Sequence, residues 1–369
     1  MTDPPPEPAR PSGPDLPTIG IVGAGVMGAG IAQLALEAGH EVVVHDVDET
    51  ALQRGRDRIL EGLGRRAAKR ADPATTEAWV AERIAGLRGV DVLEQLGDEA
   101  DVVIEAALEA LELKQTIFRV LDAVTGPDVV LATNTSALSI ASIATATERP
   151  ERVLGLHFFN PAPVMRLVEV VAGPRTDPAV VERGAALVAA WGRTPVRSAD
   201  TPGFIVNRVN RPFTIEALRI VEEGAASVDR VDEVMRDAGY PLGPFELMDL
   251  TGIDVTHAAA TAIWERLGRP DRLRPSPIQE ERIAAGALGR KTGEGFHRYD
   301  GGRRVGVARP FEGGSSHLST GAIRDRIEGA VAAEARRAVE AGVATEDDVD
   351  LALRLGAGHP AGPFERLRR

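Results

Sequence analysis

Apolar positions in the first half of the chain gather into short continuous runs. Between them, apolar residues recur every three or four positions, as in segment 31–38. Such runs are typical of strands buried on both faces of a sheet, and the intervening spacing is that of amphipathic helices. The alternation predicts an α/β fold with a Rossmann-type, doubly wound and mostly parallel sheet. The runs cover residues 18–22, 41–45, 100–106, 129–133, 152–159 and 166–171.

The second half of the chain has the helical period and contains an internal repeat. Residues 216–227 align with 334–345, and residues 238–246 align with 357–365. The offset is 118 residues and rises to 119 after one insertion. A repeat at this spacing indicates one supersecondary unit used twice. We therefore expect an all-α C-terminal region made of two helical copies.

These patterns divide the chain into five expected segments. Residues 1–17 carry seven prolines and are expected to be a disordered tail. Residues 18–199 are expected to form the Rossmann domain. The first helical copy (copy one) is predicted over 200–300 and a truncated second copy (copy two) over 322–369. A Gly- and Ser-rich linker is predicted over 301–321 between them.

Composition narrows the function classes. Among 369 residues, 55 acidic residues outnumber 43 Lys and Arg, for a net charge of −12, which argues against a general nucleic-acid binder. No apolar run reaches the length that a membrane helix needs. Cysteine is absent, which excludes disulfides, thiolate zinc sites and a cysteine nucleophile. The chain suits a reducing compartment, so we expect a cytoplasmic protein without a metal site.

A glycine-rich loop between the first strand and the first helix predicts a dinucleotide site. Gly23, Gly25 and Gly28 have the Gly-x-Gly-x-x-Gly spacing, and Asp46 ends the second strand, 18 residues beyond the last glycine. An acid there binds the ribose hydroxyls and repels a 2′-phosphate, which favours NAD over NADP. A strand–turn–helix without a ligand is the alternative. The expected cofactor contacts here are Gly23, Gly25, Val26, Met27, Gly28 and Asp46.

Residues 48–95 have a helical pattern that is unusually basic on one side. A docking surface for a phosphate-bearing substrate would need such a face. A solvated helix face that alternates bases with acids would have the same composition. The pattern leaves both interpretations open. The basic residues at issue include Arg65, Arg66, Lys69 and Arg70.

His157 and Glu169 are the strongest candidates for acid–base chemistry. His157 ends a predicted strand, and Glu169 is the one acid in the next apolar run, 12 residues on. A carboxylate in a buried strand is costly unless it is paired, and the imidazole is its natural partner. A glutamate that orients a histidine produces a general base. A purely structural His–Glu pair would have the same spacing.

Several ordered blocks resemble the 3-hydroxyacyl-CoA dehydrogenase family, from residue 18 to the C-terminus. The longest block is Gly155–Val170, and Asn134-Thr-Ser136 precedes its histidine by 21 residues. Three further blocks lie in the helical region, at 200–208, 239–250 and 290–296. The C-terminal region differs from single-copy members such as 3-hydroxybutyryl-CoA dehydrogenases because the helical domain is duplicated.

The resemblance implies NAD-dependent oxidation of a short- to medium-chain L-3-hydroxyacyl-CoA to 3-oxoacyl-CoA, a reaction of fatty-acid β-oxidation. His157 would take the hydroxyl proton and Glu169 would orient it. Ser136 and Asn207 would hold the substrate oxygen and the histidine region. The resemblance adds to the cofactor site Glu109, Lys114 and Asn134.

Two other activities remain open at this point. A relative acting on a free hydroxy acid, of the L-gulonate or carnitine type, would share the fold and the His–Glu pair. A non-catalytic, crystallin-like NAD-binding protein would share the fold alone. The helical domain mediates dimerisation in single-copy members, so the resemblance implies either a homodimer or a monomer whose two copies form a pseudo-dimer.

Overall fold

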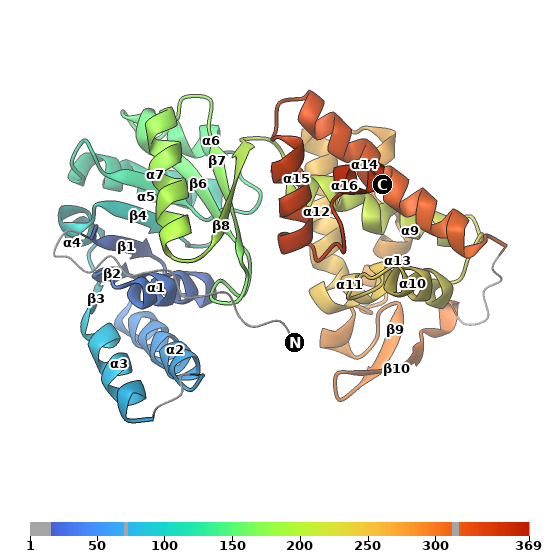
Figure 1. Cartoon of the computed structure of the whole chain (residues 1–369), viewed down its shortest axis with the longest axis horizontal. Helices are drawn as coiled ribbons and strands as arrows, with labels where there is room; N and C mark the ends of the chain where they lie inside the picture. Colours follow the sequence, from blue (N-terminus) through green and yellow to red (C-terminus); the bar gives the residue numbers. More distant parts are fainter. Residues whose placement is uncertain (1–15, 70–72, 312–316, 369) are drawn as a thin grey trace. The chain divides into compact units, whose positions relative to one another are not determined.

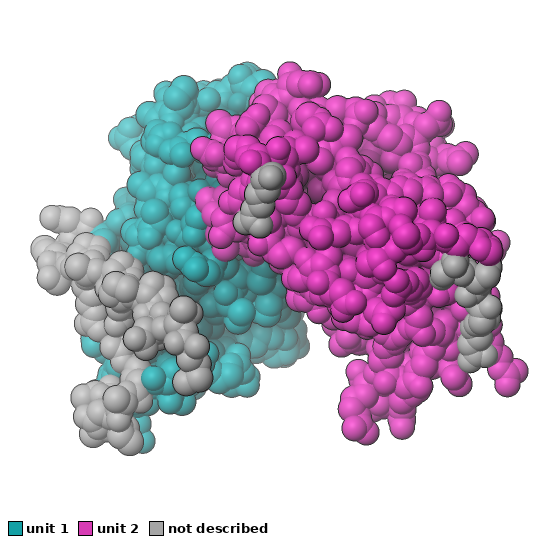
Figure 2. All heavy atoms as spheres, turned by 45° about the vertical axis from the view of Figure 1, so that its right-hand side comes forward, with its two compact units in different colours: residues 1–200 teal, residues 201–369 magenta. Residues whose placement is uncertain are grey.

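The computed structural model describes residues 16–69, 73–311 and 317–368 (Figure 1). Nearly all of the expected Pro-rich tail, and Arg70, lie outside these residues. The chain separates into two compact units, residues 1–200 (unit 1) and 201–369 (unit 2), coloured separately in Figure 2. No helix in the described ranges has the length and apolar character needed to cross a bilayer.

Unit 1 is built on an eight-stranded sheet of order β3-β2-β1-β4-β5-β6-β7-β8. All neighbours pair in parallel except β6 and β7, which are antiparallel. The sheet is thus the predicted mostly parallel one. The strands are β1 (Ile19–Val22), β2 (Val42–His45), β3 (Leu87–Val90), β4 (Val102–Glu105), β5 (Val130–Thr133), β6 (Val153–Phe158), β7 (Leu167–Ala172) and β8 (Thr194–Ala199).

Helices flank this sheet, and their apolar sides complete the core of unit 1. Their bounds are α1 (Val26–Ala38), α2 (Glu49–Ala67), α3 (Pro73–Ala85), α4 (Leu93–Glu99), α5 (Leu111–Val124), α6 (Ile140–Ala144) and α7 (Pro178–Ala190). The strands β1, β4 and β5 are buried along their whole length, as their continuous apolar runs predict. The sheet therefore places the ends of these strands rigidly.

The helical pattern expected over residues 48–95 is wrong at residues 87–90, which form β3. This strand and β8, which the apolar runs also miss, are the two edges of the sheet. An edge strand has one unpaired side and is only partly covered, so it needs no continuous apolar run. β3 accordingly exposes Arg88 and Gly89, and β8 carries Pro195, a residue that edge strands tolerate.

Unit 2 is helical, with one small hairpin. Its helices are α8 (Val206–Val209), α9 (Arg211–Glu222), α10 (Val228–Asp237), α11 (Pro244–Thr251), α12 (Ile253–Arg266), α13 (Pro277–Ala284), α14 (Thr320–Glu340), α15 (Glu346–Gly356) and α16 (Pro363–Leu367). The hairpin strands are β9 (His297–Asp300) and β10 (Arg303–Val307), so β10 lies inside the segment expected to be a linker. Short 3₁₀ helices cover Asp271–Leu273, Arg290–Thr292 and Arg309–Phe311 in unit 2, and Pro150–Arg152 in unit 1.

The two helical copies contact each other reciprocally within unit 2. Arg208 of copy one bonds Glu334 on α14 at 2.9 Å, and Arg326 on α14 bonds Glu216 on α9 at 2.6 Å. Arg208 and Arg326 are equivalent in the repeat, as are Glu216 and Glu334. Each copy thus presents the same arginine to the same glutamate of the other, which is the arrangement of a self-complementary interface.

Candidate active site

The surrounding backbone constrains the three glycines of the loop between β1 and α1 to different degrees. Gly23 has φ +101°, and an added Cβ would lie 2.8 Å from the Ala106 carbonyl oxygen. A Cβ at Gly28 would lie 1.8 Å from the Gly23 carbonyl oxygen. A Cβ at Gly25 would meet nothing within 4 Å. The packing of the described chain therefore requires Gly23 and Gly28, whereas Gly25 leaves open space at the start of α1.

That open space fits the pyrophosphate of a dinucleotide. It lies at the N-terminus of a 13-residue helix, whose first amides attract an anion. Asp46 follows β2 and accepts hydrogen bonds from the Ala24 and Val47 amides, both at 2.7 Å. Each carboxylate oxygen has a second lone pair for a ribose hydroxyl. Val26 is 62% exposed at the beginning of α1, beside this surface, and Met27 is partly buried.

Lys114, expected as a cofactor contact, forms a buried ion pair with Glu105, a residue not among the expected site residues. Lys114 Nζ lies 2.6 Å from Glu105 Oε1 and 3.5 Å from Glu109 Oε2. Glu105 also accepts from Thr133 Oγ1 at 2.7 Å, so the pair is well hydrogen-bonded. Lys114 is 1% exposed, which leaves little surface for direct contact with a ligand. Its structural effect is to hold Glu105 and Glu109 in place.

Glu109 in turn fixes the loop after β5. Its Oε1 accepts from Thr135 Oγ1 at 2.6 Å, from the Ser136 amide at 2.9 Å and from the Ala137 amide at 3.2 Å. Burial alone would raise the pKa of Glu109, but the Thr135 hydrogen bond and the Lys114 charge hold it below its usual value. The carboxylate is therefore ionised at neutral pH and orders the segment that carries exposed Ser136.

Asn134 joins the ends of two strands. Its backbone N–H donates to the Glu105 backbone carbonyl at 2.7 Å, and its side-chain Oδ1 accepts from the Phe158 backbone N–H at 2.8 Å. These bonds connect β4 to β6 across the end of β5. The side-chain oxygen of Asn134 thus has a structural role, next to the strand that carries His157.

His157 and Glu169 lie directly opposite each other on the antiparallel strands β6 and β7. His157 Nδ1 is 2.6 Å from Glu169 Oε2, and both side chains are buried. A carboxylate accepts, so this geometry places a proton on Nδ1 and makes Nε2 the basic nitrogen. The ring of Phe159 lies against the imidazole, with centroids 4.4 Å apart. The structure therefore brings together the two residues that the sequence predicted to pair.

The carboxyl ends of four parallel strands assemble these groups. β1, β4, β5 and β6 run in the same direction, and the glycine loop, Glu105, Asn134 and His157 lie at or just beyond their ends. Ligands of open α/β sheets bind at this edge. Asn207, the remaining expected site residue, lies on α8 in unit 2.

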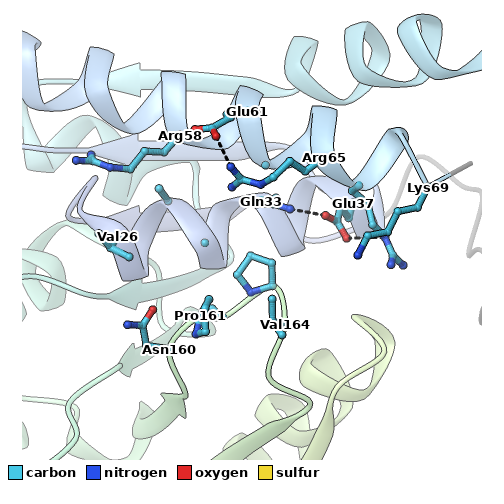
Figure 3. Close-up of a pocket in the computed structure, with 16 residues that line it drawn as sticks. Val26, Gln33, Glu37, Arg58, Glu61, Arg65, Lys69, Asn160, Pro161 and Val164 are labelled. Carbon is cyan, nitrogen blue, oxygen red and sulfur yellow. Dashed lines mark hydrogen bonds and ion pairs between the residues drawn. The ribbon is translucent and has the colours of Figure 1, made fainter. Parts of the chain in front are cut away.

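A cavity of about 490 Å³ opens beside α1 and α2 (Figure 3). Figure 3 shows side chains from both helices on one side and segment 160–164 on the other. Its lining includes four cationic side chains against the two carboxylates of Glu37 and Glu61. Sequence reasoning did not predict that segment 160–164 would form part of a pocket wall. The cationic side chains are Arg58, Arg65, Arg66 and Lys69.

Comparisons with known proteins identify the same family in both halves of the chain. Residues 18–201 match the model for the NAD-binding domain of 3-hydroxyacyl-CoA dehydrogenase. Residues 203–299 and, separately, 321–369 match the model for the C-terminal domain of the same family.

Individual relatives are similar over most of the chain. The 3-hydroxyadipyl-CoA dehydrogenase of Escherichia coli K12 is 43% identical over 291 residues, which is 79% of this chain and 60% of that protein. The 3-hydroxybutyryl-CoA dehydrogenase of Bradyrhizobium diazoefficiens is 39% identical over 78% of this chain and 97% of its own length. The crystal structure of E. coli K12 3-hydroxybutyryl-CoA dehydrogenase covers 95% of this chain and 90% of its own, at 34% identity and a TM-score of 0.86.

Proposed function

Because this chain belongs to the 3-hydroxyacyl-CoA dehydrogenase family of NAD-dependent oxidoreductases, we propose that it oxidises the C3 hydroxyl of a short- to medium-chain L-3-hydroxyacyl-CoA, such as 3-hydroxybutyryl-CoA. The observation that carries the proposal is the buried His157–Glu169 pair at the edge of the sheet where the glycine loop lies. Relatives named for 3-hydroxybutyryl-CoA and 3-hydroxyadipyl-CoA support a CoA thioester as substrate.

In this proposal His157 Nε2 takes the hydroxyl proton. Glu169 accepts a hydrogen bond from Nδ1, which fixes the tautomer and stabilises the imidazolium once the proton has moved. Bound NAD would supply the acceptor for the hydride that leaves C3. Ser136, on the loop ordered by Glu109, is assigned a hydrogen bond to the substrate oxygen, and Asn207 is assigned to the same oxygen and the histidine region.

The cofactor is assigned to the loop between β1 and α1. Gly25 gives the pyrophosphate access to the first amides of α1, and Asp46 receives the adenosine ribose. Val26 and Met27, in the first turn of α1, would contact the bound cofactor. Glu109, Asn134 and Lys114 support the nicotinamide side, the last through its bonds to the two glutamates.

The cavity beside α1 and α2 is assigned to the phosphates of CoA. The cationic residues that line it outnumber the carboxylates. Arg65 already forms an ion pair with Glu61, and Arg66 with Glu37. Lys69 is the variant of choice because it forms no ion pair among the described residues. Lys69→Ala is expected to raise KM for acetoacetyl-CoA several-fold and to leave KM for acetoacetyl-pantetheine, which lacks the nucleotide, unchanged.

The decisive experiment follows NADH absorbance with acetoacetyl-CoA and, in parallel, with free acetoacetate. The wild-type chain is expected to reduce the 3-oxo group of acetoacetyl-CoA, and His157→Gln to lower kcat by about 10²–10⁴-fold, the usual contribution of a general acid or base. His257→Gln, a histidine of unit 2, is the matched control. Turnover of the free acid alone would place the protein among hydroxy-acid dehydrogenases. NADH binding without turnover of either would favour a non-catalytic binding protein.

A further inference from the structure

Asp200, the last residue of unit 1, is a carboxylate to which the proposed reaction gives no role. It directly follows β8, and its backbone N–H donates to the Ala172 carbonyl at 3.0 Å, which fixes it to the end of β7. Its side-chain Oδ2 accepts two hydrogen bonds from a distant part of the chain, from Ser139 Oγ at 2.7 Å and from the Ala141 backbone N–H at 2.8 Å. Because hydrogen bonds to a charged acceptor are the stronger ones, Asp200 ties Ser139 firmly to the sheet.

This contact does more than cap the helix α6. Ser139 is itself the N-cap of this five-residue helix, and its Oγ accepts from the Ser142 backbone N–H at 3.2 Å. Asp200 accepts the proton of the same hydroxyl, so it fixes the direction of the Ser139 side chain. Its other oxygen, Oδ1, is enclosed and has no hydrogen-bond partner among the described residues. Within the described chain, the carboxylate of Asp200 therefore serves the segment after β5.

The loop between β5 and α6 carries Ser136 and has a carboxylate anchor at each end. Glu109 holds it at residues 135–137, and Asp200 holds it at Ser139. Ser136 is itself exposed, so its position depends on these anchors more than on packing. Because only two residues separate Ser136 from Ser139, loss of the Asp200 anchor leaves Ser136 free to shift.

We propose that Asp200 is a positioning residue of the reaction, which holds Ser136 where its hydroxyl reaches the substrate oxygen. This inference rests on the proposed function and adds to it a residue from the end of unit 1. A misplacement of about 1 Å at a reacting centre costs about 10²-fold in rate, so an anchor three residues away affects turnover. Asp200 touches neither substrate nor cofactor in this assignment and acts through the loop alone.

A double-mutant cycle, followed by NADH absorbance with acetoacetyl-CoA, tests whether Asp200 acts through Ser136. Asp200→Ala and Ser136→Ala are each expected to lower kcat/KM by about 10- to 100-fold. The double variant is expected to match Ser136→Ala within about 2-fold, because the anchor has no further effect once the hydroxyl is gone. Independent effects would multiply, and a further loss of about 10-fold in the double variant would overturn the inference. Wild-type activity in either single variant would overturn it as well.

Control variants separate positioning from a general loss of stability. Asp177→Ala removes the carboxylate that caps α7, where it accepts from the Ala179 backbone N–H at 2.8 Å, and is expected to keep the wild-type kcat/KM. Ser139→Ala removes the hydroxyl and keeps Asp200, so it replaces Asp200→Ala in the cycle if that variant does not fold. Ser139→Thr, which keeps a hydroxyl at the N-cap, is expected to recover the activity that Ser139→Ala loses.

Hydrogen exchange supplies a readout that does not depend on turnover. The backbone amides of residues 136–141 are expected to exchange faster in Asp200→Ala than in the wild-type chain, and to be unchanged in Asp177→Ala. Unchanged exchange of this segment in a folded Asp200→Ala protein would overturn the inference. Faster exchange without any turnover by the wild-type chain would instead contradict the proposed function and leave the anchoring of the loop by Asp200 standing.

Discussion

Replacing Gly25 by alanine separates cofactor binding from folding. The backbone at Gly25 has φ −66° and ψ −170°, which is extended and open to any residue, and the added methyl group contacts no other part of the described chain. The change therefore introduces neither strain nor a clash. Its one structural consequence is a methyl group on the surface assigned to the pyrophosphate.

Both expected effects follow from this geometry. Alanine stabilises by about 0.4–1 kcal/mol because the unfolded chain loses entropy. As an N-cap it is poorer than glycine by an amount of similar size, roughly 0.5–1 kcal/mol. The net change in the free energy of unfolding is thus within about 1 kcal/mol. A phosphate held away from an amide loses a charge-assisted hydrogen bond of about 1.5–3 kcal/mol, which raises the NADH dissociation constant roughly 10- to 100-fold.

Urea unfolding without cofactor measures the change in the free energy of unfolding. Fluorescence titration with NADH measures the change in its dissociation constant. Gly28→Ala is the matched comparison, since its Cβ would lie 1.8 Å from the Gly23 carbonyl oxygen. That variant is expected to lose about 1–3 kcal/mol of stability or more, as overpacked sites do. An unchanged NADH affinity in a folded Gly25→Ala protein would refute the placement of the pyrophosphate at this glycine.

Three further predictions concern stability and assembly. Lys114→Met leaves the Glu105 carboxylate buried and unpaired, so urea unfolding is expected to show a loss of about 3–5 kcal/mol, and adding Glu105→Gln should recover part of it. Burial and the charge of Arg366 lower the pKa of His359 from 6.5 to about 3. Between these pH values His359 is protonated in the unfolded chain and neutral in the folded chain. Unfolding free energy is expected to fall by about 1.4 kcal/mol per pH unit from this group between pH 6 and 4, and a His359→Gln series without a shallower slope would contradict the assignment. Light scattering is expected to give the 39.1 kDa mass of one chain, whereas a tight dimer formed through copy one would contradict the internal pseudo-dimer.

The sequence was most informative where a single physical requirement fixes the residue. Buried parallel strands need continuous apolar runs, and the glycine loop needs a missing Cβ at Gly23 and Gly28, so both could be predicted. The His157–Glu169 pairing followed from the cost of one acid in a buried strand. The buried Glu105–Lys114 pair could not be predicted in this way. Lys114 lies on α5, where the sequence pattern would suit a solvent-exposed lysine equally well. Only the packing of α5 against the sheet brings Lys114 to Glu105 and removes it from water.

The edge strands and the cavity wall depended on tertiary contacts. The residues of β3 and β8 have mixed polarity because each pairs on one side only, and neither has a local pattern that distinguishes it from a loop. Segment 160–164 acquires a role only from α1 and α2, which precede it by about a hundred residues in the chain.

The reciprocal contacts between the two helical copies affect which residues can occupy the interface between them. In a dimer of identical chains, a residue on the two-fold axis meets itself, and any substitution alters both sides at once. Tyr240 and His359 occupy equivalent positions of the repeat, and their rings lie 5.0 Å apart. One chain can therefore place two different rings across its own pseudo-axis, a contact that identical subunits related by that axis cannot form.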